Sequence, residues 1–398
     1  MNLYKYFYKY IFFFLILFIF QSCSDSPTDT GLDLLDNQKV TVVLFDSSID
    51  SINQNSQSFL KRINTGLADR LLLGQVSETK SSILIEFNIA FDESTRNLIK
   101  SNDVQVVSNR IMFKKNYSFG DTSVVFQSSN INGYRINSEW APDKVRLDSM
   151  PSIDKSQDIL TSKPSPDSLY YFGISNAVVL DWVKNAADTS LAKNYGIFLE
   201  PQANTSYIIG FQGYSNTLQT APQIEITLRF LTTGRDSTLI FNSISDAHVI
   251  EGYYDKQPDL LAVRSGIAIN TKLYFDLSKI PADALINYAE LTLVNDSTKT
   301  VIGSSGFNSI ITSVISTAVS DTVLTDYVSP TGSLIFSNGR YNGNVTSVIT
   351  RIIREKNTLG ILLKPGLEIE GLETIYFKSS NAIISERPQL KITYSRLK

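Results

Sequence analysis

The chain has few of the residues that carry most enzyme and metal chemistry: one cysteine and one histidine among 398 residues. A zinc site or a disulfide framework needs several such residues, so neither can be built here. No GxxxxGK[ST], GxGxxG or HExxH pattern occurs. The sequence therefore has no motif of a phosphate-binding loop, of a dinucleotide-binding fold or of a zinc metalloprotease. A basic surplus is also missing, because 36 Lys and Arg face 39 Asp and Glu for a net charge of −3, and this argues against a nucleic-acid partner. We therefore expect no cofactor and no metal.

An export signal occupies residues 1–22. Lys5 and Lys9 precede an unbroken apolar run over residues 11–20, and a short polar exit leads to Cys23. A basic head followed by an apolar run and a small residue is typical of a signal peptide. The run has ten residues, about half of the roughly 20 that a membrane-spanning helix needs, so a permanent transmembrane segment is the weaker interpretation.

The single cysteine stands where the apolar run has ended. Ser22 precedes Cys23, and a polar tether rich in Ser, Thr and Asp covers residues 23–37. This arrangement resembles a bacterial lipobox, and the resemblance implies that Cys23 becomes the lipidated first residue. Removing residues 1–22 deletes two of the 36 basic residues and no acidic one, so 34 basic residues face 39 acidic ones, a net charge of −5. We expect a mildly acidic protein anchored by lipid in the cell envelope, at the outer membrane.

Short runs rich in Val, Ile, Phe, Tyr and Thr recur along the mature chain between breaks of Asn, Asp, Ser and Gly, which is typical of β-structure. Several runs alternate apolar and polar residues, so one face packs on a core and the other meets water. Antiparallel sheets packed face to face follow from this pattern. The expected strands are 40–45, 82–89, 104–113, 207–211, 224–230, 272–277, 290–294, 360–363 and 390–394. Two short helices, 175–184 and 345–356, should plug the open ends of the sandwiches.

An internal repeat of long period divides the mature chain. Residues 195–201 (YGIFLEP) match 359–365 (LGILLKP), and 221–228 (APQIEITL) match 387–394 (RPQLKITY). The period is too long for a solenoid, so matched strands at matched spacing indicate a duplicated domain. The sequence predicts a first β-sandwich over 38–231, a polar linker over 232–236 and a second β-sandwich over 237–398.

The order of motifs in the second copy resembles a DNRLRE domain. Residues 246–250 (DAHVI) open it, 273–281 (LYFDLSKIP) and 289–293 (AELTL) follow, and 387–394 close it. The resemblance implies a jelly-roll β-sandwich of secreted bacterial proteins, related to carbohydrate-binding modules. The first copy diverges from this pattern: it has 88–93 (NIAFDE) where the second copy has 276–281 (DLSKIP), and it carries inserts such as 149–167.

The titratable residues form no catalytic constellation in the sequence. His248 has no partner of the kind that nucleophilic catalysis requires, so we expect it to be packed or on the surface. Acidic pairs such as Asp46 with Asp50, or Asp92 with Glu93, are interpreted as turn acids, because Asp favours turns. No Asp-x-Asp-x-Asp loop supports a calcium site. We expect no catalytic residue.

Sugar-binding surfaces usually present an aromatic face beside amide and carboxylate groups. The candidate glycan-contact residues are Trp140, Tyr214, Tyr253, Tyr254 and Tyr341, whereas Trp182 lies on the apolar face of its helix and is assigned to the core. The leading expectation is a non-enzymatic, lipid-anchored envelope protein that binds or organises surface polymer, with carbohydrate as the first choice. The alternative is a structural or assembly lipoprotein that docks on another envelope protein, and a polysaccharide-degrading enzyme ranks third.

Overall fold

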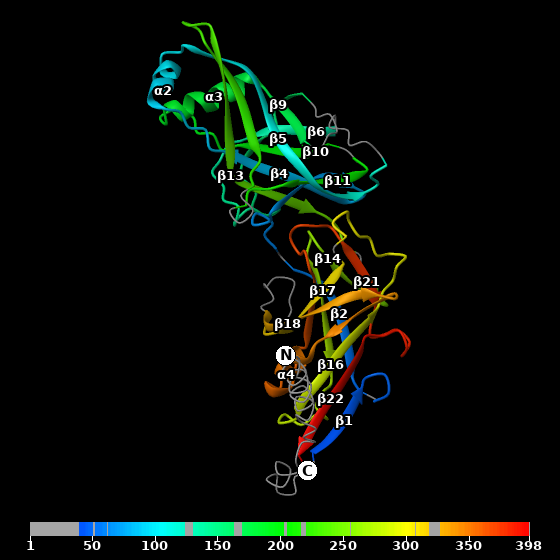
Figure 1. Ribbon diagram of the computed structural model, residues 1–398. Coiled ribbons are helices and arrows are strands. Elements are labelled where there is room, and N and C mark those ends of the chain that lie inside the picture. Colours follow the sequence, from blue (N-terminus) through cyan, green and yellow to red (C-terminus); the bar gives the residue numbers. More distant parts are fainter. Residues whose placement is uncertain are drawn as a thin grey trace, which may run out of the picture.

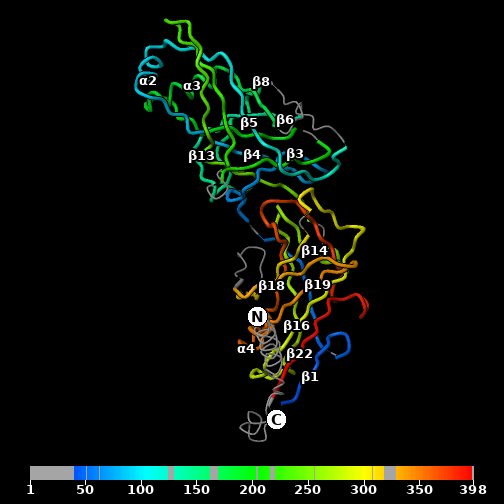
Figure 2. The backbone as a smooth tube through the Cα atoms, viewed as in Figure 1, coloured from blue at the N-terminus to red at the C-terminus, as the bar shows by residue number. Residues whose placement is uncertain are grey.

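The computed structural model describes residues 40–397 apart from 51, 62, 124–129, 163–168, 203–204, 216–219, 255, 307 and 318–326. The molecule is elongated and consists of two antiparallel β-sandwiches placed end to end (Figures 1 and 2). This confirms the expected all-β class of two β-sandwiches with short helices. The signal peptide, Cys23 and the tether lie outside the described residues. Within the described part of the chain, no helix is long and apolar enough to cross a bilayer.

The first sandwich holds the middle of the chain. Its strands are β3 (Arg70–Val76), β4 (Thr79–Phe87), β5 (Val104–Gly120), β6 (Ile131–Ile136), β7 (Ile153–Asp154), β8 (Leu160–Ser162), β9 (Leu169–Ile174), β10 (Ile197–Pro201), β11 (Tyr207–Gln212), β12 (Gln223–Phe230) and β13 (Arg235–Glu251). Its helices are α2 (Glu93–Lys100) and α3 (Asn176–Ala187).

The second sandwich combines both ends of the described chain. Its strands are β1 (Val40–Asp46), β2 (Gln54–Leu60), β14 (Leu260–Arg264), β15 (Ile269–Phe275), β16 (Leu285–Val294), β17 (Ser309–Ile315), β18 (Tyr327–Ser337), β19 (Arg340–Asn344), β20 (Ile361–Pro365), β21 (Thr374–Lys378) and β22 (Gln389–Leu397). Its helix is α4 (Thr346–Arg354).

Each sandwich is completed by the opening segment of the other copy. β1 runs antiparallel to β22, and β2 runs antiparallel to β15 with Leu60 opposite Ile269. β13 pairs instead with β12 through residues 235–242 and with β4 through residues 243–251. The opening segment of the first copy therefore belongs to the second sandwich, and the opening strand of the second copy belongs to the first.

This exchange corrects the expected domain boundaries. The boundaries at 38 and 237 assigned β1 and β2 to the first sandwich and β13 to the second, whereas the pairing inserts the first sandwich, β3 to β13, between β2 and β14 of the second. The expected linker 232–236 is a hairpin turn: Phe230 pairs with Arg235, and Gly234 adopts a φ of +64°. Polar residues with a glycine are as typical of hairpin turns as of linkers, which is why the sequence misled here.

The two sandwiches share one pairing pattern. β5 lies beside β12 and β9 just as β16 lies beside β22 and β19. β10 lies between β4 and β6 just as β20 lies between β15 and β17. The opening segments are equivalent too. β13 pairs with β12 and then with β4, just as β1 pairs with β22 and β2 pairs with β15. The topology agrees with duplication of one unit.

The alternation in the sequence places the cores between the sheets. Ile224, Ile226 and Leu228 of β12 are fully buried, and the polar residues between them are half exposed. The corresponding strand β22 buries Leu390 and Ile392 in the same way. Each fully buried aliphatic side chain of this size contributes roughly 1.5–3 kcal/mol to folding, so the period-two pattern specifies which face turns inward.

The helices confirm two expected elements and add a third. α3 packs Trp182 and Val179 into the first core, and α4 packs Val348 and Ile349 into the second. The additional helix, α2, follows β4, and Asp92 caps it by accepting a hydrogen bond from the Thr95 amide at 2.8 Å. It stands where the first copy diverges in sequence. The second sandwich has no helix at the corresponding position, and a cavity of about 410 Å³ lies there beside α4.

Tyr117 of β5 joins the two sandwiches. It is buried, its hydroxyl accepts a hydrogen bond from the Leu372 amide at 3.0 Å, and its ring lies where any Cβ on Gly303 would overlap it. The Arg70 guanidinium stacks over this ring, 4.6 Å from its centroid, and donates a hydrogen bond to the Glu370 carbonyl at 2.6 Å. The two sandwiches therefore pack against each other through side chains, in addition to being connected by the two chain segments that pass between them.

Candidate functional site

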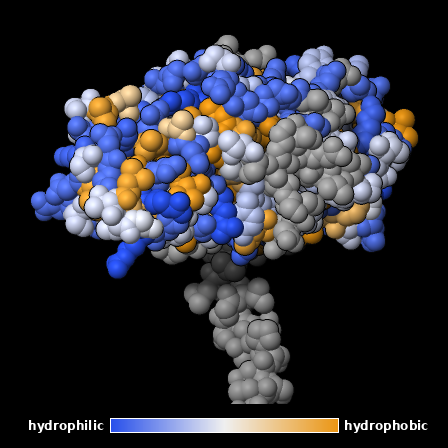
Figure 3. Space-filling view, turned by 90° about the horizontal axis from the view of Figure 1, so that it is seen from above, coloured by the Kyte–Doolittle hydropathy of each residue, from blue (hydrophilic) through white to orange (hydrophobic). Residues whose placement is uncertain are grey.

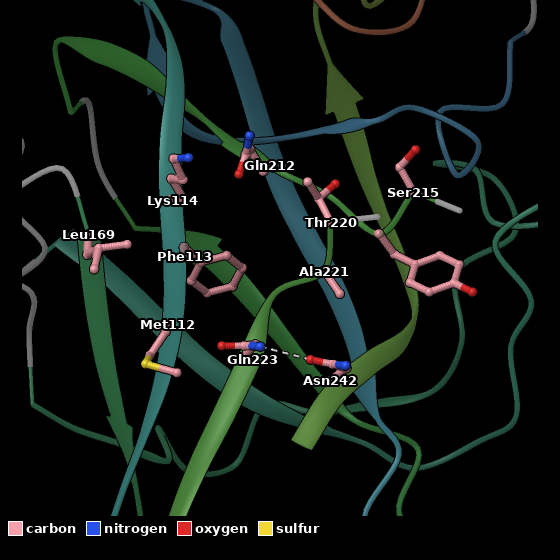
Figure 4. Close-up of a pocket in the computed structure, with 11 residues that line it drawn as sticks. Met112, Phe113, Lys114, Leu169, Gln212, Ser215, Thr220, Ala221, Gln223 and Asn242 are labelled. Carbon is pink, nitrogen blue, oxygen red and sulfur yellow. Dashed lines mark hydrogen bonds between the residues drawn. The ribbon is translucent and has the colours of Figure 1, made fainter. Parts of the chain in front are cut away.

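The long strand β5 creates a gap in the first sandwich by pairing with two strands in turn. It pairs with β12 as far as Met112, opposite Gln223, and with β11 from Lys115, opposite Phe211. Between these pairings the chain leaves the sheet at residues 213–215 and returns through 220–222, and these two described stretches are called the side loop. A hollow of about 460 Å³ lies where this loop meets β5 and the start of β9 (Figure 4).

The hollow has an apolar floor and a polar rim. Phe113 belongs to the core, where its ring contacts Phe172 edge to face with centroids 5.7 Å apart. The rim combines one ammonium, three side-chain amides, two hydroxyls and one phenol. The lining residues are Met112, Phe113, Leu169 and Ala221 for the apolar part, and Lys114, Gln212, Tyr214, Ser215, Thr220, Gln223 and Asn242 for the polar part.

Tyr214 is the aromatic residue of the rim, and its backbone is held firmly. Its amide donates to the Asp246 carboxylate at 2.7 Å, and the Ser215 amide donates to the Thr220 carbonyl at 2.9 Å, which closes the loop. The Thr220 hydroxyl donates to the Gly213 carbonyl at 3.0 Å. The Tyr214 side chain is 38% exposed, so part of it faces solvent at the hollow.

Asp246 supports this loop from the exchanged strand β13. Burial raises the pKa of its carboxyl to about 7, against the opposing effect of the Tyr214 amide, and nearby Asp69 raises it further. His248, two residues along β13, is fully buried, and burial lowers the pKa of its imidazole to about 3, so the ring is neutral at physiological pH. The histidine is thus packed, one of the two environments expected for it.

Asn242 and Gln223 form an amide pair across β12 and β13. The Gln223 Nε2 donates to the Asn242 Oδ1 at 2.9 Å (Figure 4). Asn242 comes from the second copy of the repeat, whereas the other lining residues come from the first. The rim of the hollow is therefore completed by the strand exchange.

The structure places the other aromatic candidates away from this hollow. Tyr341 is fully buried and donates a hydrogen bond to Asn308, so it cannot present a face to a sugar, and this prediction is wrong. Trp140 packs against the outer face of a sheet, and its Nε1 donates to the Tyr195 carbonyl at 2.9 Å. Its role here is packing.

The two adjacent tyrosines also lie outside the hollow. Tyr254 packs against a small apolar cluster that includes Ile267 and Ile269. Tyr253 is 66% exposed, and it is not among the described residues that line the hollow beside Tyr214. The structure therefore brings Tyr214 to a hollow and leaves the other candidates elsewhere.

The acidic residues occupy structural positions. Asp46 accepts hydrogen bonds from the amide and the hydroxyl of Ser48, at 2.9 and 2.6 Å, in the turn after β1. Asp92 is the cap of α2. Within the described ranges, no three His, Cys, Asp or Glu side chains group closely enough to hold a metal ion.

An apolar stripe runs along the edge strand β1. Val40, Val42 and Leu44 are exposed and alternate along one face of the strand, next to the exposed Leu285 and Tyr288 of β16 across β22. The face of the molecule seen from above is mostly polar, with apolar residues in separate patches (Figure 3). Contiguous exposed apolar residues can mark a site of interaction when the patch they form is large.

Sequence reasoning missed the amide and ammonium groups of the rim. Gln223 lies within the repeated Pro-Gln motif, but a motif shared by both copies gives no sign that one copy forms a hollow. Asn242 could not be predicted, since it reaches the site only through the exchange. Searches with the sequence found no family model that matches the chain and no curated protein that resembles it closely enough to be counted as a relative.

Proposed function

We propose that this protein is a non-enzymatic, lipid-anchored envelope protein that binds carbohydrate in the hollow beside Tyr214. The observation that supports this proposal is the grouping of a half-exposed aromatic side chain with three amides and two hydroxyls over an apolar floor. Amides and hydroxyls match the hydrogen-bonding groups of a sugar, and an aromatic side chain packs on its apolar face. The resemblance of residues 237–398 to a DNRLRE domain supports the same proposal, because it implies kinship with carbohydrate-binding modules.

The proposed lipid on Cys23 gives the molecule an orientation. β1 begins at Val40, which lies opposite Leu397 at the end of the second sandwich remote from the first (Figure 1). The chain from Cys23 to Val40 takes 17 steps, which reach at most about 60 Å when fully extended. The second sandwich would then stand nearer the membrane, and the first would hold the hollow away from it.

The hollow is tested with Tyr214→Ala. We expect this variant to lose about tenfold to a hundredfold in retention on the polysaccharide that the wild type binds, since a central aromatic contact is worth roughly 1.5–3 kcal/mol. The measurement is binding to a broad polysaccharide array. Tyr253→Ala is the matched control, because Tyr253 is more exposed than Tyr214 and lies outside the hollow. Absence of wild-type retention, or equal losses in both variants, would overturn the proposed site.

The anchor is tested separately with Cys23→Ala. Because Cys23 is the only cysteine, this change removes the only residue on which the lipobox resemblance places the lipid. We expect the variant to leave the membrane fraction on cell fractionation, while the wild type remains there. A variant that still partitions fully with membranes would show that the anchoring proposal is mistaken.

A second candidate function is docking on another envelope protein. The apolar stripe of Val40, Val42 and Leu44 favours it, because an exposed apolar edge strand is a template for a partner's strand or apolar surface. Photo-crosslinking from Val42 in the envelope distinguishes the two candidates. A specific protein adduct together with failure of every glycan in the array would favour docking.

A further inference from the structure

The charge of the hollow indicates which class of sugar it takes. We propose that the hollow binds an acidic polysaccharide, in which a uronate carboxylate or a sulfate group contacts the ammonium of Lys114. This inference rests on the proposed carbohydrate binding and adds the substrate class to it.

Lys114 is the only charged side chain among the described residues that line the hollow, and no carboxylate is among them. It lies on β5 at the rim, on the same side of the hollow as Gln212 (Figure 4). The side chain is exposed, and the ion pairs found among the described residues do not use it. The ammonium is therefore available to a ligand.

Two acidic side chains on the neighbouring strands β12 and β13 are engaged elsewhere. Glu225 of β12 pairs with Arg110 at 3.0 Å. Asp246 is buried beneath the side loop and accepts the Tyr214 amide. Sites for neutral sugars commonly use a carboxylate to accept hydrogen bonds from ring hydroxyls, and this hollow offers no such acceptor within the described lining.

The amide pair adds a second donor to the rim. Because the Asn242 Oδ1 already accepts from Gln223, the Asn242 Nδ2 is left to donate to a ligand. The Lys114 ammonium and this amide lie at different parts of the rim (Figure 4), so the ammonium suits an anionic oxygen while the amide suits another polar group of the same ligand. Charge-assisted hydrogen bonds are roughly twice as strong as neutral ones.

The binding should depend strongly on salt. The whole chain carries a net charge of −3, so its overall field does not attract a polyanion, and the attraction must come from the local ammonium. A single exposed ion pair is screened over about 10 Å at 0.1 M salt. Raising the salt concentration should therefore weaken the acidic interaction selectively.

Matched glycan pairs test the inference. The probes are polygalacturonate against its fully methyl-esterified form, and a sulfated glycosaminoglycan against its desulfated form. We expect the full-length wild type to bind an acidic member at least tenfold more tightly than its neutral partner. Lys114→Gln should lose about tenfold on the acidic member only and should remove most of the salt dependence. Its unfolding midpoint should not change, because the side chain is exposed.

Lys115→Gln is the matched control. Lys115 is the next residue on β5, does not line the hollow, and lies over the Tyr207 ring, 6.0 Å from its centroid. It should bind the acidic member like the wild type. Equal retention of neutral and acidic members that still depends on Tyr214 would overturn the acidic class and leave carbohydrate binding intact. Loss of retention on all glycans would overturn both proposals.

Discussion

A fragment cut at the sequence repeat, residues 38–231, should not fold cooperatively, whereas a fragment of residues 64–254 should. The first fragment keeps β1 and β2, which have no partners in it, and lacks β13, which pairs with both β12 and β4. The second fragment contains every strand of the first sandwich. Thermal unfolding followed by circular dichroism and calorimetry measures the difference.

The expected effect is large because β13 contributes to both sheets of the sandwich. It pairs through eight residues with β12 and through a further eight with β4. It also carries Ala247 and His248, which are fully buried. With each ladder hydrogen bond worth about 1 kcal/mol net, the loss is on the order of 10 kcal/mol, comparable with the whole stability of a typical domain. A cooperative transition in 38–231, or its absence in 64–254, would contradict the exchange.

Gly196→Ala and Gly360→Ala should each destabilise one sandwich strongly. These equivalent glycines open β10 and β20 with φ values of +92° and +95°. An added Cβ would overlap the carbonyl oxygen of Ile85 in the first copy and of Leu273 in the second. Backbone strain of about 1–3 kcal/mol adds to overpacking of similar size. We expect a loss of about 3–5 kcal/mol and a fall of roughly 10 °C in the unfolding midpoint.

Gly234→Ala provides the control for these substitutions. Gly234 has a φ of +64° in the β12–β13 turn, and no atom lies within 4 Å of the position that a Cβ would take. Alanine at position 234 therefore has only the left-handed backbone conformation against it, and we expect it to lower the free energy of unfolding by about 1 kcal/mol. Three equal effects on the unfolding midpoint would mean that the close approach of the β4 and β15 carbonyls is not what requires glycine.

The strands and the repeat could be predicted from the sequence because they depend on local signals. Alternation along β12 and β22 reports which side chains face a core, and the two copies keep the same order of motifs. The alternation of apolar and polar residues does not show with which other strand a given strand pairs. The pattern of β13 suits pairing with β12 and β4 as well as with β22 and β15, so the exchange between copies could not be predicted.

The site was less accessible to sequence reasoning than the fold. Tyr341 was a candidate glycan contact, but β19 turns its side chain into the second core, although its neighbours Arg340 and Asn342 are polar. Tyr214 is half exposed at a hollow, and its contact with a glycan stays a prediction. The polar groups around it gather only because β5 changes partner between Met112 and Lys115, a long-range event with no local signature.

Disulfide trapping in a Cys23→Ser background tests the strand exchange most directly, because the rim of the hollow and the position of the tether both depend on it. Val249 lies opposite Ser82 of β4, so the pair Ser82→Cys with Val249→Cys should cross-link on mild oxidation, as detected by mass spectrometry. Asn270 of β15 is the position that Val249 would face if each copy kept its own opening strand. The exchange predicts an 82–249 disulfide and no disulfide in the Val249→Cys, Asn270→Cys variant; the opposite result would contradict it.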